Sequence, residues 1–356
     1  MARRLVAGLD SYDKINFVFK KYFCEKNLNV YIQLYIIYTQ SMSRLRLFFA
    51  TDLHGSDKCF RKFLNTPKVY GANVIIIGGD LTGKAIVPII TDEGIEYANY
   101  MGQKVIIKNR DQEENLIKEI SDSGYYPLKV SQKEYEELTA DKKKLDEVFL
   151  KLMKERLESW IKLAEEKLLN SGVKVIMNAG NDDALELDTV LDSSSFVIHP
   201  EGKVLELDGY EMISTGYANV TPWHAPRDIP EEELEKKIED MASRVKNMEK
   251  AIFNIHPPPY NTGLDMAPKV DENLRPVALP GTVVMVPVGS VAVRKMIEKY
   301  QPMLGLHGHV HESRGAKNLG RTLIINPGSD YPYGILRGAI INLEDGKLKS
   351  YMLTTG

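Results

Sequence analysis

Three of the chain's seven histidines, His307, His309 and His311, stand at alternate positions in the segment GLHGHVHES (305–313). Alternate side chains of a β-strand point to the same face, so this spacing would place three imidazoles side by side. Imidazole is a common ligand of Mn, Fe, Ni and Zn. A polar turn after a strand would explain the same residues without a metal, and the segment alone leaves both interpretations open.

Polar residues also follow other short apolar segments of the chain. These segments are LRLFFATD (45–52), NVIIIGGD (73–80), VKVIMNAGND (173–182), KAIFNIHPPP (250–259) and TLIINPGS (322–329). Short continuous apolar runs predict buried strands, and α/β proteins place ligand sites at the ends of such strands. The nitrogen and oxygen donors at these ends are Asp52, His54, Asp80, Asn181, His256, His309 and His311. This set without thiolates suits Mn, Fe, Zn or Ni, and it divides naturally between two ions if one carboxylate bridges them.

The order of these blocks resembles that of the calcineurin-like metallophosphoesterases, whose pattern is D-x-H, G-D, G-N-H with a following acid, a single H, and G-H-x-H. This chain has Asp52-Leu-His54, Gly79-Asp80, Gly180-Asn181-Asp182-Asp183, His256 and Gly308-His309-Val310-His311, over about residues 45–330. The resemblance implies a mixed α/β or α+β fold with four α-β-β-α layers. It implies that Asp52, His54 and His311 hold one cation, that Asp80 bridges, and that Asn181, His256 and His309 hold the other. His307 lies outside the pattern and is expected to support the site.

Two cations about 3.5–4 Å apart can activate a water and stabilise both oxygens of an in-line displacement. A phosphoester is anionic and hydrolyses very slowly in water, so it benefits most from such a site. We therefore predict a metal-dependent phosphoesterase with two divalent cations, manganese favoured, and a phosphodiester or nucleotide-type substrate slightly favoured. A DNA-repair nuclease is an alternative among enzymes, and a protein-binding scaffold with the same fold is the non-catalytic alternative.

The third block departs from the family pattern, because Asp182 stands where the family has a histidine that assists the leaving group. An aspartate of ordinary pKa is ionised at pH 7 and cannot donate a proton. Three outcomes are open: Asp182 acts as an acid with a shifted pKa, another group replaces it, or activity is lost. The segment YANVTPWHAPRD (217–228) offers His224 as a catalytic replacement and Arg227 and Asn219 as substrate contacts. Lys84 is expected to be a solvated surface lysine.

Composition sets broad limits on the function. The net charge of -3 over 356 residues gives no indication of general nucleic-acid binding. The two cysteines, Cys24 and Cys59, form no CxxC pair, which suits a reducing cytoplasm. No apolar run of about 18 residues predicts a membrane span. Because MSRLRLFFATDLHGS begins a core strand, we expect the native chain to start at Met42 and residues 1–41 to be an extension of doubtful structure.

Helical periodicity is present at about 132–170 and at 230–252, where Asp228 is a candidate N-cap. Residues about 92–131 break the alternation of strand and helix. Within them QKVIIKN (103–109) predicts a short strand and DQEENLIKEI (111–120) a short helix. We interpret about 92–170 as a helical insertion, which forms either a cap or a surface elaboration without function, in a domain of residues 42–356.

Overall fold

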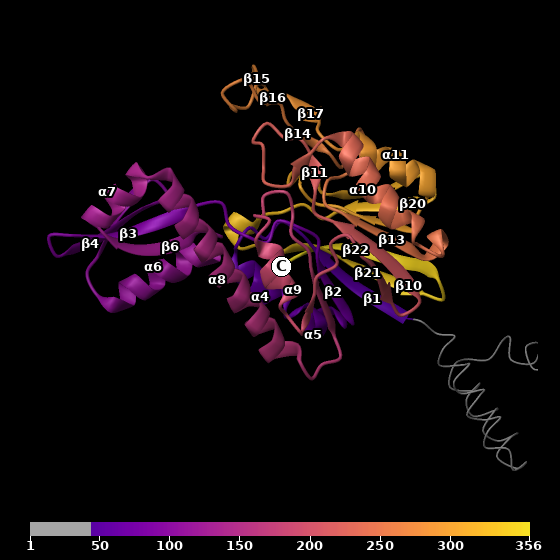
Figure 1. Ribbon diagram of the computed structural model, residues 1–356, viewed down its shortest axis with the longest axis horizontal. Helices are drawn as coiled ribbons and strands as arrows, with labels where there is room; N and C mark the ends of the chain where they lie inside the picture. Colours follow the sequence, from indigo (N-terminus) through magenta and orange to yellow (C-terminus); the bar gives the residue numbers. More distant parts are fainter. Residues whose placement is uncertain (1–43) are drawn as a thin grey trace, which may run out of the picture. The chain divides into compact units, whose positions relative to one another are not determined.

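Two six-stranded β-sheets form the centre of the chain in this computed structural model, which describes residues 44–356 (Figure 1). The predicted extension at 1–41, the start at Met42 and Cys24 lie outside the described residues. The first sheet has the order β22 (Lys347–Thr355), β21 (Arg337–Glu344), β1 (Arg44–Ala50), β2 (Val74–Ile77), β7 (Lys174–Met177), β8 (Val197–Ile198). The second has the order β19 (Gly315–Leu319), β20 (Thr322–Asn326), β18 (Leu304–Leu306), β13 (Ala251–Ile255), β10 (Tyr210–Thr215), β9 (Val204–Leu207).

The apolar segments found in the sequence are the central strands of these sheets. In the first sheet β1, β2 and β7 are parallel neighbours, and in the second β13, β18 and β20 are parallel neighbours. Along β1, Leu47 and Phe49 face the core between the sheets, whereas Phe48 and Ala50 face helices. Both faces of each sheet are therefore covered, which explains why these runs are continuously apolar.

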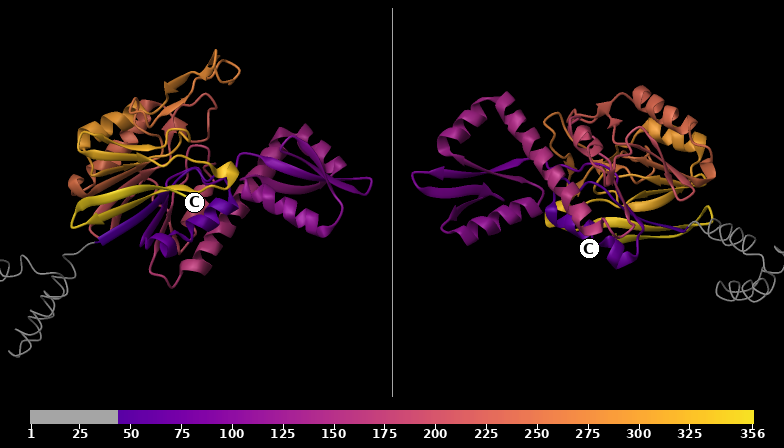
Figure 2. Two further views of the ribbon diagram at one scale, coloured as in Figure 1. Left: turned by 180° about the vertical axis from the view of Figure 1, so that it is seen from behind. Right: turned by 60° about the horizontal axis from the view of Figure 1, so that its bottom comes forward.

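Helices cover the outer face of each sheet (Figure 2). On the first sheet they are α4 (Asp57–Phe63), α5 (Thr66–Tyr70), α8 (Lys142–Leu168) and α9 (Leu187–Asp192). On the second they are α10 (Glu231–Ser243) and α11 (Val291–Tyr300), whose buried side chains include Ile238 and Met296. The order of layers is α-β-β-α, so the predicted fold class is confirmed.

An inserted segment after Lys84 forms a body with its own core. It has a sheet in the order β5 (Gln103–Ile107), β4 (Ile95–Tyr100), β3 (Ile86–Asp92), β6 (Tyr126–Ser131), with helices α6 (Arg110–Asp122) and α7 (Gln132–Ala140). Val87, Ile89 and Ile120 are among its buried residues. The predicted strand at 103–109 and helix at 111–120 are confirmed as β5 and α6. The other three strands of the insertion, β3, β4 and β6, were not predicted.

The helix predicted at 132–170 is two helices. Asp141 ends α7 in an extended conformation, and its side chain accepts a hydrogen bond from the Lys144 N–H to cap α8. The apolar side of α8 then packs on the first sheet through Leu157, Trp160 and Ala164. Most of α8 is therefore an outer layer of the main fold, contrary to the interpretation of the whole helix as part of a cap.

Shorter elements complete the described chain. They are β11 (Ala218–Asn219), β12 (Asp228–Ile229), β14 (Met266–Pro268), β15 (Ala278–Leu279), β16 (Thr282–Val283), β17 (Met285–Pro287) and the 3-10 helices Met248–Lys250 and Tyr331–Tyr333. The helix predicted at 230–252 ends at Ser243, and Pro230 rather than Asp228 is its N-cap residue. Within residues 44–356 no helix is both long enough and apolar enough to cross a membrane.

The position of α8 in the core gives a stability prediction. Trp160 is 2% exposed, stacks on Phe60 with ring centroids 4.2 Å apart, and donates from Nε1 to Asp57 Oδ1 at 2.6 Å. Replacing it with alanine would leave a large cavity, so Trp160→Ala should lower the free energy of unfolding by about 3–5 kcal/mol. Denaturant unfolding would measure this loss.

Leu169, at the end of the same helix, is the matched control. It is 58% exposed, so Leu169→Ala should change the free energy of unfolding by less than about 0.5 kcal/mol. Equal effects of the two substitutions would contradict the packing of α8 on the first sheet.

Candidate metal centre

Five parallel strands deliver the predicted donors to one place. Asp52 and His54 follow β1, Asp80 follows β2, Asn181 follows β7, His256 follows β13, and His309 and His311 follow β18. Parallel neighbours end at the same edge of a sheet, so their carboxyl ends bring these residues together. The seven predicted donors form one cluster, although they come from both sheets.

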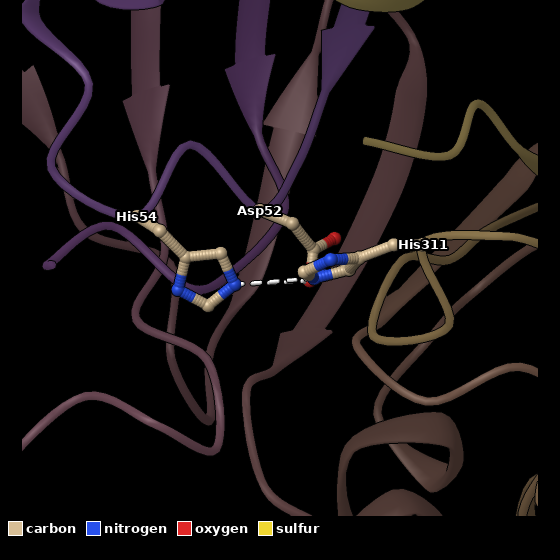
Figure 3. Close-up of side chains that lie close together, drawn as sticks. All are labelled: Asp52, His54 and His311. Carbon is tan, nitrogen blue, oxygen red and sulfur yellow. Dashed lines mark hydrogen bonds and ion pairs between the residues drawn. The ribbon is translucent and has the colours of Figure 1, made fainter. Parts of the chain in front are cut away.

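Asp52, His54 and His311 form the first group of possible ligands (Figure 3). His311 Nε2 lies 3.2 Å from Asp52 Oδ1 and 3.2 Å from His54 Nε2. The carboxylate of Asp52 is held by the His309 N–H at 3.1 and 3.0 Å and by the Thr51 hydroxyl at 2.7 Å. The backbone of the loop after β18 therefore fixes the carboxylate of Asp52, which lies in the loop after β1.

Asp80, His256 and His309 form the second group, with Asn181 beside it. Asn181 Oδ1 lies 2.9 Å from His309 Nδ1, while its Nδ2 donates to Asp228 Oδ1 at 3.1 Å. Asp228 thus turns the amide oxygen toward the cluster, a role that the sequence did not predict for it. Asp80 Oδ2 lies 3.3 Å from His256 Nε2 and 3.5 Å from His54 Nε2, which is the position that a bridging carboxylate requires.

The donors fit divalent cations. His54 Nδ1 and both ring nitrogens of His256 are buried without a hydrogen-bond partner, because the 3.3 Å approach of His256 to Asp80 lacks hydrogen-bond geometry. Buried polar atoms are normally paired, so unpaired imidazole nitrogens beside two carboxylates fit a site for a cation. Oxygen and imidazole donors of this kind suit Mn, Fe, Zn or Ni.

The protonation of His309 and His256 affects metal binding, because an imidazole must be neutral to act as a ligand. Burial lowers the pKa of His309 to about 4, so its imidazole is neutral and ready to act as a ligand. Burial opposes the charged form of His256 too, but the interactions with Asp80, Asp52 and Asp182 together outweigh it and raise the pKa to about 9. A cation bound at the second group would therefore displace a proton from His256.

Four of these residues have backbones in the left-handed region, with φ of 55° at Asp52, 40° at His54, 50° at Asp80 and 66° at His309. For a non-glycine residue this conformation costs on the order of 1–2 kcal/mol. Such strain persists only where the surroundings hold it, and it is concentrated at functional sites. Its occurrence at four predicted ligands makes this cluster the candidate functional site.

Glycines let the blocks approach one another closely. A Cβ on Gly79 would overlap the ring of His256, and one on Gly308 would overlap the side chains of Thr51 and Asp52. Glycine is therefore required directly before Asp80 and directly before His309, because the loops at the ends of the two sheets approach each other closely there.

His307, which the sequence predicts to support the site, contacts the backbone on both sides of His256. It is fully buried, and its Nδ1 lies 2.8 Å from the Ile255 carbonyl and 3.1 Å from the Pro257 carbonyl. These carbonyls flank His256. Of the three histidines in GLHGHVHES, His309 and His311 belong to the groups of possible ligands and His307 does not.

Asp182, which stands where the family pattern has a histidine, forms an ion pair with Lys84. Asp182 Oδ2 pairs with Lys84 Nζ at 2.5 Å, and the Asp182 N–H donates to Asp80 Oδ1 at 3.0 Å. The Asp182 carboxylate also lies close to His54 and Asp80 as a third possible group of ligands. Lys84 is thus not simply solvated, because the pair holds its ammonium beside the cluster.

Arg227 and His224 do not occupy the positions predicted for them. Arg227 is fully buried and donates to the Asp183 and Ala184 carbonyls and to both carboxylate oxygens of Asp188. It braces the loop that carries Asn181 and does not line the cleft described below. His224 is exposed and does not line the cleft described below.

Asn219 and Asp183 also have structural contacts. The Asn219 Nδ2 donates to the Val288 carbonyl at 3.3 Å, and Asn219 does not line the cleft. Asp183 is fully buried and accepts from the N–H groups of Leu81, Thr82 and Gly180. It joins the loops after β2 and β7, so it positions Asp80 and Asn181 relative to each other.

A cleft of about 840 Å³ opens onto the cluster. Asp80, Asn181, Asp182, His309 and His311 line one end of it. Its walls come from α8, from the loop at 221–226 and from the segment at 267–288. The volume lies within the usual range for small-molecule sites, so a ligand of substantial size fits beside the metal ligands.

No family model matches the chain. An uncharacterised protein of Methanocaldococcus jannaschii is 30% identical over 168 residues, which are 47% of this chain and 67% of that protein. One solved structure has a TM-score of 0.52 at 15% identity and covers 88% of this chain and 98% of its own. TT1561 of Thermus thermophilus (TM-score 0.45, 16% identity, 88% and 98% coverage) and an archaeal phosphodiesterase (TM-score 0.36, 12% identity, 88% and 100% coverage) are more distant.

The geometry predicts how substitutions change metal content. The full chain loaded with manganese and dialysed should hold about two ions. His311→Ala and His256→Ala should each lower this to about one, because each removes a donor from a different group, and Asp80→Asn should affect both sites. Elemental analysis by mass spectrometry measures the content.

His224→Ala is the control for this measurement, because His224 is exposed and outside the cleft. It should leave the metal content unchanged. Loss of both ions from the His256→Ala and His311→Ala chains alike would contradict the separation of the donors into two sites.

Proposed function

This chain belongs to the family of the Methanocaldococcus jannaschii protein and has the calcineurin-like metallophosphoesterase fold, and we propose that it is a metal-dependent phosphoesterase. Two divalent cations, with manganese favoured, are proposed at Asp52, His54 and His311 and at Asn181, His256 and His309, with Asp80 between them. The single observation that carries the proposal is the convergence of these donors, with strained backbones, at the floor of a ligand-sized cleft.

When bound, such cations lower the pKa of water and stabilise charge on phosphoryl oxygens. The chain's own contribution is to hold the donors rigidly. The Asp52 carboxylate is fixed by three hydrogen bonds and the Asn181 amide by Asp228. Preorganised charges of this kind need no rearrangement when the reaction occurs, and this is usually the largest contribution to catalysis.

The proposed role of Lys84 replaces that of the family's histidine. In hydrolysis, a water oxygen forms a bond to phosphorus while the ester oxygen leaves with the bonding electrons. Asp182 holds the Lys84 ammonium at the rim of the cluster. Since the Asp182 carboxylate raises the Lys84 pKa, the ammonium is retained as a fixed positive charge and is a poor proton donor. It would stabilise charge on a phosphoryl oxygen or on a leaving group that needs no proton.

A phosphodiester is the slightly favoured substrate type, because good leaving groups depend least on a general acid. A protein-binding scaffold with the same fold is the alternative. The strained backbones at Asp52, His54, Asp80 and His309 support the enzyme over the scaffold, because a binding surface has no need for them.

The first test compares the wild-type chain with Asp80→Asn. With manganese bound, the wild type should hydrolyse an aryl phosphodiester faster than the matching phosphomonoester. Asp80→Asn weakens both cation sites and should lower kcat/KM by at least about a thousandfold. The rate of nitrophenolate release measures both. Equal rates for the two chains, or no turnover with any common divalent metal, would rule out the enzyme and favour the scaffold.

The second test concerns Lys84. Lys84→Met should lower kcat/KM by about tenfold to a hundredfold, less than the loss of a buried oxyanion-hole donor because Lys84 is partly exposed. Lys84→Arg should retain most of the activity. Lys144→Met, which removes a similarly exposed lysine outside the cleft, is the control. Unchanged kinetics in Lys84→Met would mean that the pair with Asp182 is only structural.

A further inference from the structure

The cleft beside the metal centre has walls of a different chemistry from its floor. The floor carries the charged and imidazole side chains, whereas α8 contributes Phe149 and Met153, and the 267–288 segment contributes Val270, Leu274 and Val288. Trp223 stands on the loop between them. If the phosphorus atom of a substrate lies at the floor, the group esterified to it must lie along these walls.

Two apolar side chains of the walls are left open to solvent. Trp223 is 63% exposed and Leu274 is 43% exposed. Contiguous exposed apolar surface that lines a groove marks a ligand-binding groove or an interaction site. Covering such surface stabilises a complex by roughly 25 cal/mol per Å². The walls are therefore suited to an apolar group on the substrate.

The charges of the cleft argue against a polyanionic substrate. Among the lining residues, Lys84 is the only lysine or arginine, and it is already paired with Asp182. Asp146, Glu186 and Glu312 add carboxylates around the cleft. Nucleic acids and nucleotides with several phosphates are bound through multiple lysines and arginines. One phosphate at the metals, with no further charge beyond it, matches this distribution.

Apart from the carboxylates of Asp146, Glu186 and Glu312, which accept but do not donate hydrogen bonds, the walls offer few partners to the edge of a base. Thr221 is the only hydroxyl-bearing residue in the lining, and its hydroxyl donates to Asp228 Oδ2 at 2.5 Å. Recognition of a nucleobase depends on free hydrogen-bonding groups along its edge as well as on stacking. An alkyl or aryl group requires neither charge nor hydrogen bonds.

We propose that the cleft selects phosphodiesters in which one ester group is an extended apolar chain or ring. This inference rests on the proposed function and specifies its substrate class. The phosphate would lie at the floor beside Lys84, and the apolar group would pack on Phe149, Leu274 and Trp223.

The test uses methyl, butyl and octyl esters of 4-nitrophenyl phosphate below their micelle concentrations, with the manganese-loaded full chain. All three have the same leaving group, so differences report the apolar chain alone. The ratio of kcat/KM for octyl to methyl should be at least about tenfold, well below the limit set by complete burial of every methylene. The 4-nitrophenyl ester of thymidine 5′-phosphate is compared under the same conditions.

Leu274→Ser should lower the octyl-to-methyl ratio by at least about threefold, since it removes part of the apolar wall. Leu279→Ser is the matched control, because Leu279 is 59% exposed on β15 but does not line the cleft, and it should keep the wild-type ratio. A flat series in the wild type, or faster turnover of the thymidine ester than of the octyl ester, would overturn the inference.

Failure of the proposed phosphoesterase function would give a different result from failure of the proposed selectivity for apolar esters. If no ester is hydrolysed, calorimetric binding of methylphosphonate and octylphosphonate to the manganese-loaded chain decides the question. Tighter binding of octylphosphonate in the wild type but not in Leu274→Ser would keep the inference while removing the phosphoesterase. Equal binding of the two phosphonates would overturn the inference by itself.

Discussion

Two buried carboxylates and four imidazoles occupy one small volume at the carboxyl ends of the central strands, and much of the structure serves to hold them there. Carboxylates this close repel one another, and buried imidazole nitrogens without partners are costly. Cations between them would reduce the repulsion between the carboxylates and would also give the imidazole nitrogens a partner. The fold tolerates strained backbones at Asp52, His54, Asp80 and His309 in order to keep this arrangement.

The two sheets have a specific part in this arrangement. Each supplies an incomplete set of donors, because β1, β2 and β7 carry both carboxylates and the amide, whereas β13 and β18 carry three of the four imidazoles. Contacts across the interface then fix the geometry. The His309 N–H holds Asp52, and Asn181 Oδ1 meets His309 Nδ1. Packing of the apolar core between the sheets therefore determines the spacing of the site.

A layer of residues that do not line the cleft contacts the donors and their loops. Asp228 turns the Asn181 amide, Asp183 ties together the loops of Asp80 and Asn181, and Arg227 braces the same loop from inside. Asp182 differs from these, because it faces the cluster and holds Lys84 there. The place of the family's histidine is thus taken by an ion pair whose cation comes from the loop after β2.

The sequence by itself determined the strands and the donors at their ends, since continuous apolar runs and the residues that follow them are local features. It also predicted β5 and α6, because each can be recognised from the residues of its own short segment. The contacts of Arg227, Asp228 and Lys84 and the exposure of His224 were decided only by the tertiary structure. Each depends on which distant atoms surround the side chain: Arg227 finds Asp188 and two carbonyls in the interior, and Lys84 finds Asp182 from another loop. Burial and pairing of this kind arise from long-range packing, which local sequence does not encode.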